Sequence, residues 1–166
     1  MSDREAGSLG RMLALVLRHA PEKFNVDMDI NGWVSTRELA DSISGQRRHY
    51  HWLRGWHFEA IANADEKGRY QVEGEMIRAT YGHSIEIELD LPTDEIPEAL
   101  YWPCEPTEAD AIVQLGITSG TRNHIPLSKT IVNALEAGHV RIDRPAIIEI
   151  DTVRAVADGH TIYRAG

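Results

Sequence analysis

Two prolines near the middle of the 166-residue chain, Pro92 and Pro97, separate two segments whose patterns of apolar residues differ. Proline fits poorly inside helices and strands, so a short stretch bounded by two prolines is typical of a linker. Helical and hairpin patterns precede Pro92, whereas short apolar runs mixed with short helical patterns follow Pro97. We therefore expect an α+β protein of two small lobes, residues 1–92 and 97–166.

Apolar residues at helical spacing open the first lobe and predict a helix that ends near Pro21. A second helix is expected from about Thr36, because Ser35 and Glu38 have the spacing of a capping box. A third is expected to begin near Tyr50. The apolar faces of the first and third helices are Leu9, Met12, Leu13, Val16 and Leu17, and Leu53, Trp56, Ala60 and Ile61.

Two short strands are expected after the third helix, Arg69–Val72 and Met76–Ala79, joined as a hairpin through Gly74. Three helices and a hairpin are typical of a winged helix, which usually binds nucleic acid. The third helix carries histidines and Arg54 rather than a dense basic stripe, so it gives little support for binding in a duplex groove. From Ile85 to Leu91, apolar and acidic residues alternate, which predicts a strand buried on one face.

The second lobe is expected to combine short strands and helices. The chain stops at Gly166, soon after the extended pair Ile162-Tyr163, which leaves open whether a final strand is missing. The expected elements are extended Leu100–Trp102, helical Ala109–Leu115, extended Ile125–Leu127, helical Ile131–Leu135 and a buried strand Ala146–Ile150.

Composition narrows the classes of function. The formal net charge of -9 argues against a general polyanion binder, so any contact with RNA must be local. A single cysteine, Cys104, excludes an internal disulfide and a paired-cysteine zinc site. No HExxH spacing occurs, and we expect no metal. The chain also lacks GxGxxG and P-loop patterns, so any dinucleotide would bind outside a Rossmann fold. No apolar stretch is long enough for a signal peptide or a membrane span, and we expect a cytoplasmic monomer.

Two groups of cations stand beside turn residues. Arg18 and His19 close the first helix, where positive charge is favourable and simple capping is one interpretation. Arg78 lies on the predicted hairpin, where a lone arginine is usually solvated or salt-bridged. If the helix end and the hairpin lie side by side, Arg18, His19 and Arg78 would form a phosphate-binding claw, because guanidinium donors match phosphate oxygens.

Three motifs resemble the RNA 2′-phosphotransferase family: Leu17-Arg18-His19-Ala20-Pro21, Asn31-Gly32-Trp33-Val34, and Ile77-Arg78-Ala79-Thr80-Tyr81-Gly82-His83-Ser84. In that family, a winged-helix lobe holds the phosphorylated RNA and an ADP-ribosyltransferase-like lobe holds NAD+. The resemblance therefore implies these two lobes, RNA with a 2′-phosphate as substrate, tRNA among the candidates, and NAD+ as co-substrate. It also implies a role in tRNA splicing.

The resemblance implies a transfer in two steps. The RNA 2′-phosphate attacks the nicotinamide-bearing carbon of NAD+ and releases nicotinamide. A ribose hydroxyl then attacks that phosphate, which gives RNA with a 2′-hydroxyl and ADP-ribose 1″,2″-cyclic phosphate. Carried over by motif, the catalytic residues are Arg18, His19, Arg78 and Arg122, the phosphate contacts also include His83 and Ser84, and the NAD+ contacts are Tyr101, Trp102 and Ser128.

The second lobe departs from the family pattern. After the strand tyrosine the family has His-Gly-Thr, where this chain has Trp102-Pro103-Cys104, and Pro126 replaces a second histidine. Two alternatives to an active transferase therefore stay open. One is a catalytically weak or inactive relative that binds phosphorylated RNA, and the other is a winged-helix transcription factor, which the acidic net charge disfavours.

Overall fold

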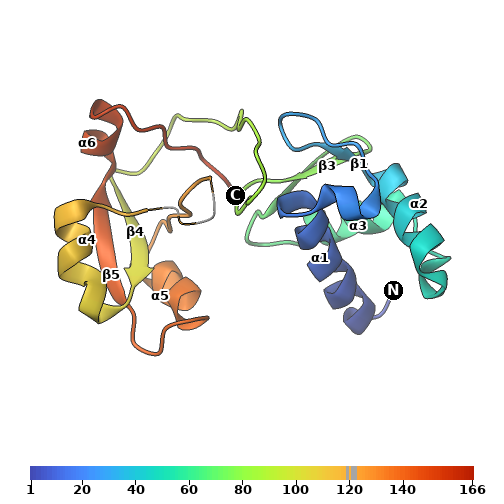
Figure 1. The fold of residues 1–166 in the computed structure, drawn as a ribbon, viewed down its shortest axis with the longest axis horizontal. Coiled ribbons are helices and arrows are strands. Elements are labelled where there is room, and N and C mark those ends of the chain that lie inside the picture. The colour runs from blue at the N-terminus through green and yellow to red at the C-terminus, as the bar shows by residue number, and fades with distance from the viewer. Residues whose placement is uncertain (119, 121–122) are drawn as a thin grey trace. The chain divides into compact units, whose positions relative to one another are not determined.

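The computed structural model describes residues 1–118, 120 and 123–166, which fall into two compact units (Figure 1). The first unit holds residues 1–91 together with Asn123, His124 and the last two residues, and the second holds most of the remainder. Helices and small sheets occur in both, so the predicted mixture of α and β structure is confirmed. The winged-helix and ADP-ribosyltransferase-like assignments stay predictions.

Helix α1 spans Asp3–Arg18 and ends near Pro21, as predicted. It begins in a complete capping box, because the Glu5 backbone N–H donates to Ser2 Oγ at 3.3 Å and the Ser2 backbone N–H donates to Glu5 Oε2 at 2.7 Å. A short 3₁₀ turn, η1 (Pro21–Phe24), follows. The proline ends the helical pattern because its ring cannot continue the helix.

Helix α2, Thr36–Gln46, begins where predicted, and Ser35 Oγ accepts the Glu38 backbone N–H at 3.2 Å. The predicted third helix is present, but its start and its buried face were predicted wrongly. A 3₁₀ turn, η2 (Arg48–Tyr50), comes first, and α3 spans Gly55–Asn63. Because residues 50–54 do not wind as an α-helix, the phase of the buried face changes: Trp56 is 60% exposed, whereas Phe58 is fully buried.

Strands β1 (Val34–Ser35), β2 (Tyr70–Glu73) and β3 (Met76–Ala79) form an antiparallel sheet in the order β1-β3-β2. The predicted hairpin is therefore confirmed, and its turn places Gly74 at a φ of 57°. The predicted strand Ile85–Leu91 is wrong. Side-chain burial in that segment does alternate, but the segment belongs to neither sheet. Its middle is anchored at Glu88, whose backbone N–H donates to Ile30 O and whose carbonyl accepts from Asn31 Nδ2, both at 2.7 Å.

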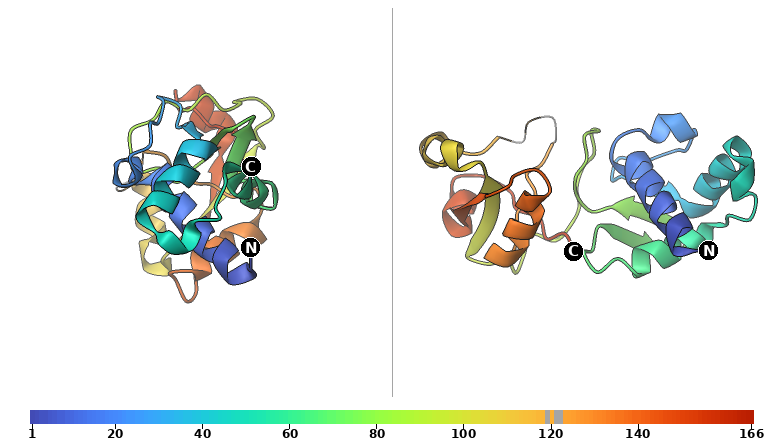
Figure 2. Two further views of the ribbon diagram at one scale, coloured as in Figure 1. Left: turned by 90° about the vertical axis from the view of Figure 1, so that its right-hand side faces the viewer. Right: turned by 90° about the horizontal axis from the view of Figure 1, so that it is seen from below.

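The second unit is built on strands β4 (Ala99–Cys104) and β5 (Ala146–Asp151), which pair antiparallel along six residues each. Figure 2 shows its helices beside this pair. Predicted helices at 109–115 and 131–135 are confirmed, the second being longer. The helices of this unit are η3 (Pro106–Glu108), α4 (Ala109–Leu115), α5 (Ile131–His139) and α6 (Thr152–Ala157).

One expectation for the second unit needs correction, the burial of β5, and two segments predicted to be extended lie outside its sheet. The stretch Ile125–Leu127 is not a strand, although Ser128 forms an isolated bridge to Tyr101. Strand β5 is half-buried rather than buried. The pair Ile162-Tyr163 joins no strand, and α6, which the sequence did not predict, begins where Asp151 Oδ1 accepts the Arg154 N–H at 3.1 Å. A carboxylate at this cap position satisfies one unpaired amide of the first turn.

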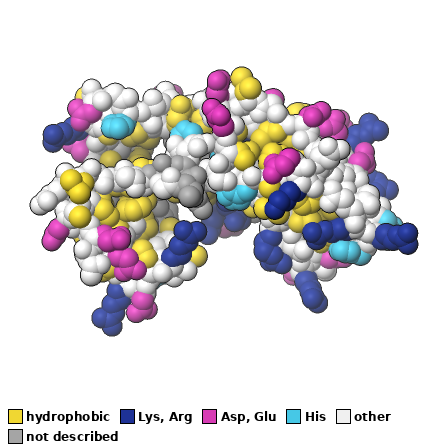
Figure 3. Space-filling view, viewed as in Figure 1, with side chains coloured by type: hydrophobic (Ala, Val, Ile, Leu, Met, Phe, Trp, Pro, Cys, Tyr) yellow, Lys and Arg dark blue, Asp and Glu magenta, His cyan; other side chains and the backbone are white. Residues whose placement is uncertain are grey.

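Acidic side chains are spread over both units on the face shown in Figure 3. Across the described residues, no helix is long and apolar enough to cross a membrane.

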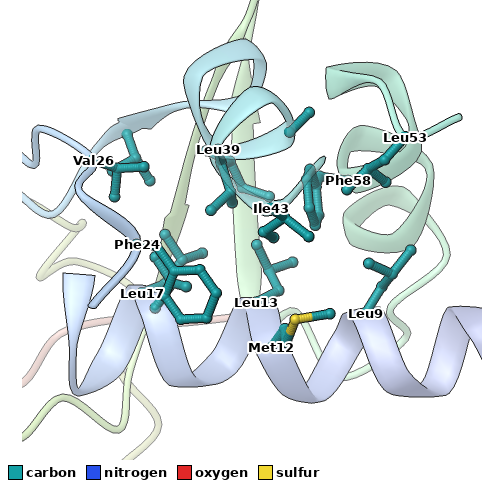
Figure 4. Packing of buried hydrophobic residues seen from close by; sticks show 14 of the residues in the cluster. Leu9, Met12, Leu13, Leu17, Phe24, Val26, Leu39, Ile43, Leu53 and Phe58 are labelled. Atoms are coloured by element: carbon teal, nitrogen blue, oxygen red, sulfur yellow. The ribbon is translucent and has the colours of Figure 1, made fainter. Parts of the chain in front are cut away.

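One hydrophobic core organises the first unit, and α1 supplies much of it (Figure 4). Leu9, Leu13 and Leu17 are fully buried against side chains of α2, α3 and the sheet. The buried cluster consists of Leu9, Met12, Leu13, Val16, Leu17, Phe24, Val26, Val34, Leu39, Ala40, Ile43, Tyr50, Leu53, Phe58, Ala62, Ile77 and Ala79.

We expect Leu13→Ala to lower the free energy of unfolding of the first unit by about 2–5 kcal/mol, because it removes buried methyl groups and leaves a cavity. Leu15→Ala, on the partly exposed side of the same helix, is the matched control and should cost much less. Urea denaturation followed by circular dichroism measures both variants. Equal losses would contradict the assignment of the buried face.

Candidate active site

The end of α1 and the loop after β3 are joined directly. The Ser84 backbone N–H donates to Arg18 O at 2.9 Å, and His19 Nδ1 lies 2.7 Å from Ser84 Oγ. These residues are 65 or 66 positions apart in the chain. The helix end and the hairpin therefore do lie side by side, as the claw hypothesis required.

The Arg18 guanidinium lies against the loop at Tyr81 and Gly82. Its Cζ is 5.1 Å from the centroid of the Tyr81 ring, a cation–π distance. Gly82 has a φ of +88°, and a Cβ built there would lie 3.2 Å from Arg18 Nε, so this close approach favours glycine. Arg18 Nε and Nη2 are buried and have no hydrogen-bond partner among the described residues. Buried charged donors without a partner are costly in a folded protein, and they fit an anionic ligand.

His83 is the second unpaired polar group. Its side chain is buried, and neither ring nitrogen has a hydrogen-bond partner in the described part of the chain. Burial lowers the pKa of His83 to about 4, and the positive charge of Arg18 acts in the same direction. The imidazole is therefore neutral at neutral pH, so one nitrogen can donate a hydrogen bond and the other can accept one.

Arg78, on β3, is buried and held on several sides. Its Nε donates to Gln71 Oε1 at 2.9 Å, its Nη1 donates to Asn31 O at 3.3 Å, and its Cζ lies 4.5 Å from the centroid of the Trp33 ring. Nη1 also forms a salt bridge with the Asp90 carboxylate, whose side chain is 55% exposed. The guanidinium is thus fixed in position, and one of its donors already faces a negative charge.

The first unit therefore brings together five of the predicted site residues: Arg18, His19, Arg78, His83 and Ser84. Arg18, His19 and Arg78 all lie close enough to His83 for their charges to lower its pKa. Their roles stay predictions. Arg122, the predicted fourth catalytic residue, lies outside the described residues.

Several contacts of this site were missed by the sequence interpretation. Gln71 faces Arg78 in the β2–β3 register, so the predicted hairpin could have identified it. Asp90 and Asn123 could not be found in this way, because they come from irregular segments. The Asn123 backbone N–H points to His83 O at 3.4 Å, and its side-chain amide donates to Ile85 O.

In the second unit, two of the three predicted NAD+ contacts, Tyr101 and Ser128, are joined by backbone hydrogen bonds. The backbone N–H of Tyr101 donates to Ser128 O, and that of Ser128 donates to Tyr101 O, both at 2.9 Å. Trp102 is half-buried on the same strand. Among the described residues, no group of His, Cys, Asp and Glu side chains could hold a metal ion.

Comparison with known proteins gives the family. Residues 4–166 match the family model described as RNA 2′-phosphotransferase, Tpt1 / KptA family. The probable RNA 2′-phosphotransferase 1 of Archaeoglobus fulgidus is 38% identical over 157 residues, which cover 95% of this chain and 71% of the relative. The probable RNA 2′-phosphotransferases of Thermoplasma acidophilum and Methanosarcina acetivorans are each 36% identical, over 168 and 165 residues. Both matches cover 99% of this chain, and they cover 70% and 78% of those relatives. The chain belongs to the RNA 2′-phosphotransferase family.

Asp90→Asn is expected to strengthen binding of a phosphate dianion by roughly 1.4- to 5-fold, the scale of one partly exposed ion pair. Gln71, Asn31 and Trp33 keep Arg78 in place, so the substitution removes a competing charge without releasing the guanidinium. Isothermal titration with an RNA dinucleotide that carries a 2′-phosphate measures the effect. Glu88→Gln, an exposed neighbour on the same segment, is the control. Weaker binding by Asp90→Asn would instead make Asp90 a positioning residue.

Binding of an anion is expected to raise the pKa of His83 from about 4. The negative charge favours the imidazolium form, and stronger binding at lower pH follows by linkage. NMR titration of His83 with and without sulfate, which stays a dianion over this pH range, measures the change. In Arg18→Ala, the pKa of His83 should rise without ligand, because a positive charge is lost, and sulfate should no longer move it. A sulfate-independent pKa in the unmodified protein would exclude His83 from the anion site.

Proposed function

We propose that this protein removes an internal 2′-phosphate from RNA and transfers it to the ADP-ribose part of NAD+. The products are RNA with a 2′-hydroxyl, nicotinamide and ADP-ribose 1″,2″-cyclic phosphate. The observation that carries the proposal is the pair of buried, unpartnered donors on Arg18 beside the neutral, unpartnered His83. Membership of the RNA 2′-phosphotransferase family supports an RNA 2′-phosphate as the anion of this site.

The residues of the first unit have separate tasks in this proposal. Arg18 offers two donors in a fixed fork, which matches two oxygens of one phosphate. Arg78 contributes a fixed positive charge that offsets the charge on the phosphate oxygens during transfer. His19, exposed and hydrogen-bonded to Ser84, can hold or move a proton at the phosphate, since the ordinary pKa of histidine lies near neutrality.

The second unit would hold NAD+. Tyr101 and Trp102 offer aromatic faces for the nicotinamide or adenine ring, and Ser128, bonded to Tyr101, offers a hydroxyl for a ribose. The donor set therefore fits the rings and sugars, but these three residues include no cation for the pyrophosphate. NAD+ supplies the acceptor carbon and nicotinamide as the leaving group. We further propose a winged-helix RNA lobe, an ADP-ribosyltransferase-like NAD+ lobe, tRNA as one substrate, and a monomer that works in the cytoplasm.

One observation favours a second function, a relative that binds phosphorylated RNA without transferring the phosphate. Pro103 and Cys104 replace the glycine and threonine of the family pattern beside NAD+. In the structure, Cys104 is buried, and a Cβ added at Gly138 would lie 2.7 Å from Pro103 Cβ. Pro103 therefore packs against α5, and the Cys104 side chain is withdrawn from the surface, which leaves fewer polar groups at this position for a dinucleotide.

Mass spectrometry separates the two functions. A short RNA with one internal 2′-phosphate is incubated with the protein, with and without NAD+. Loss of the phosphate that requires NAD+, together with ADP-ribose cyclic phosphate, supports the transferase. Binding of this RNA with no change in its mass supports the binding protein, and failure to bind it at all would refute both.

We expect Arg78→Ala to reduce phosphate removal by at least about 10²- to 10³-fold, the usual cost of losing one preorganised charge at a transition state. His19→Ala should slow turnover by roughly 10²- to 10⁴-fold if it transfers a proton. Single-turnover rates measure both variants, and Arg141→Ala, an exposed arginine of the second unit, is the control. Thermal melting checks the fold. Full activity in either folded variant would remove that residue from the active site.

A further inference from the structure

Residues 47–57 have a composition that the active site does not explain. These eleven residues, Arg-Arg-His-Tyr-His-Trp-Leu-Arg-Gly-Trp-His, hold three arginines, three histidines and three aromatic residues, and they include no acid. The chain as a whole has 26 acidic residues against 17 lysines and arginines. The segment is therefore positively charged within an acidic protein. Such a protein needs a region of this kind in order to bind a polyanion.

Most of the polar side chains of this segment reach the surface, whereas Tyr50 and Leu53 anchor it in the core. Figure 3 shows Arg or Lys and His side chains together on the first unit near the end of α2. We call the exposed set the cationic–aromatic surface. It consists of Arg47, Arg48, His49, His51, Arg54 and Trp56.

Trp56 has the geometry of a stacking platform. Its indole is 60% exposed, and its ring lies 3.7 Å from that of the buried His57 at an interplanar angle of 24°. His57 is itself held, because its Nδ1 accepts the Arg54 backbone N–H at 2.9 Å. The His57 ring therefore packs against one face of the Trp56 indole and holds it in position. A large apolar ring that is held in position and yet exposed is contacted more favourably by a stacked nucleobase than by water.

The surroundings of Trp56 also suit a base. A surface hollow of about 530 Å³ beside Trp56 is lined by Arg37 and Arg54 and by three acidic residues, Asp41, Glu59 and Glu75. The three carboxylates oppose a phosphate group at this point, but they can accept hydrogen bonds from the amino groups of bases. Arg47 and Arg48 carry the charge that a phosphate backbone needs, but at the other end of the segment: Gly55 lies against Thr36 at the start of α2, whereas Arg47 follows the end of that helix. A helix with few cations fits a duplex groove poorly, whereas a stacking ring beside cations is typical of single-strand recognition.

Helix α1 places one end of this surface, the turn η2, relative to the phosphate site. Tyr50 Oη donates to Ser8 Oγ at 3.1 Å, so η2 lies beside the first half of that helix. Ser8 and Arg18 are ten residues apart on α1, which corresponds to about 15 Å along the axis. At about 3.4 Å per nucleotide of a stacked strand, this length is roughly four nucleotides.

We propose that the cationic–aromatic surface binds single-stranded RNA on one side of the phosphorylated nucleotide, with a base stacked on Trp56. The inference rests on the proposed function, because the RNA strand that occupies Arg18 continues toward this surface. It adds a substrate preference: a longer single-stranded RNA binds more tightly than a dinucleotide with the same 2′-phosphate.

The test compares two RNAs with the full chain by fluorescence anisotropy at constant salt. One is a 2′-phosphorylated dinucleotide, and the other is a single-stranded 12-mer with the same phosphate at its centre. Trp56→Ala should weaken binding of the 12-mer by roughly 5- to 150-fold, as loss of one stacked base predicts, and leave the dinucleotide unaffected. Trp56→Phe should retain most of the affinity, and Arg47→Ala/Arg48→Ala should lower the salt dependence for the 12-mer.

The matched control is Arg141→Ala/Arg144→Ala, which removes the same charge from exposed positions of the second unit. If the Trp56 and Arg47/Arg48 variants lose affinity for the 12-mer and not for the dinucleotide, the result supports RNA binding at the cationic–aromatic surface. The proposal is overturned if the variants bind the 12-mer like the unmodified protein, if both RNAs weaken equally, or if the control loses as much.

An unphosphorylated 12-mer keeps this inference separate from the proposed function. Its binding depends on Trp56 if the surface is correct, even where no phosphate is transferred. Conversely, normal transfer from the dinucleotide with no effect of Trp56→Ala on any 12-mer would leave the proposed function standing and refute the surface.

Discussion

The hydrogen bond between the Ser84 backbone N–H and Arg18 O is the contact on which the candidate site depends. It ties the last turn of α1 to the loop that leaves the hairpin. Both partners are held independently, α1 by its buried leucines and the loop by β3, so the bond joins two rigid elements. Without it, the Arg18 guanidinium would not lie against Gly82, and His19 would not reach Ser84. The site is thus a consequence of how α1 packs on the sheet.

The proposed phosphate site poses an electrostatic problem, because the net negative charge of the protein repels an anion at long range. In this chain the solution is local. Arg18 and His83 are withdrawn from water, and charge–dipole interactions are stronger where the dielectric is low. Neutral His83 avoids adding a further buried charge to Arg18 and Arg78. Such a site selects by the geometry of its donors, whereas a basic surface attracts any polyanion.

The sequence predicted those parts of the structure that local rules determine. The α1 face, the Ser35 cap and the hairpin follow from periodicity and capping chemistry, and all three are present. The start of α3 was predicted wrongly because the chain forms the 3₁₀ turn η2 before the helix begins. No residue between 50 and 54 gives a sequence signal for this interruption. Asp90 was missed for a different reason: Ile85–Leu91 alternates like a strand, yet it has no partner strand, and its role is to bring a carboxylate to Arg78. Tertiary contacts of irregular segments leave no periodic signal.

The proposed active site also carries a cost in stability. A guanidinium with unpaired buried donors and an imidazole with no partner each lose hydrogen bonds to water that nothing in the fold replaces. The core around α1 has to offset this loss, and the fully buried leucines on the opposite side of the same helix are placed to do so. One helix therefore carries many of the core contacts of the first unit and, in Arg18, two of its unpaired buried donors. A ligand phosphate would satisfy those groups, so binding and folding of the first unit are coupled through α1.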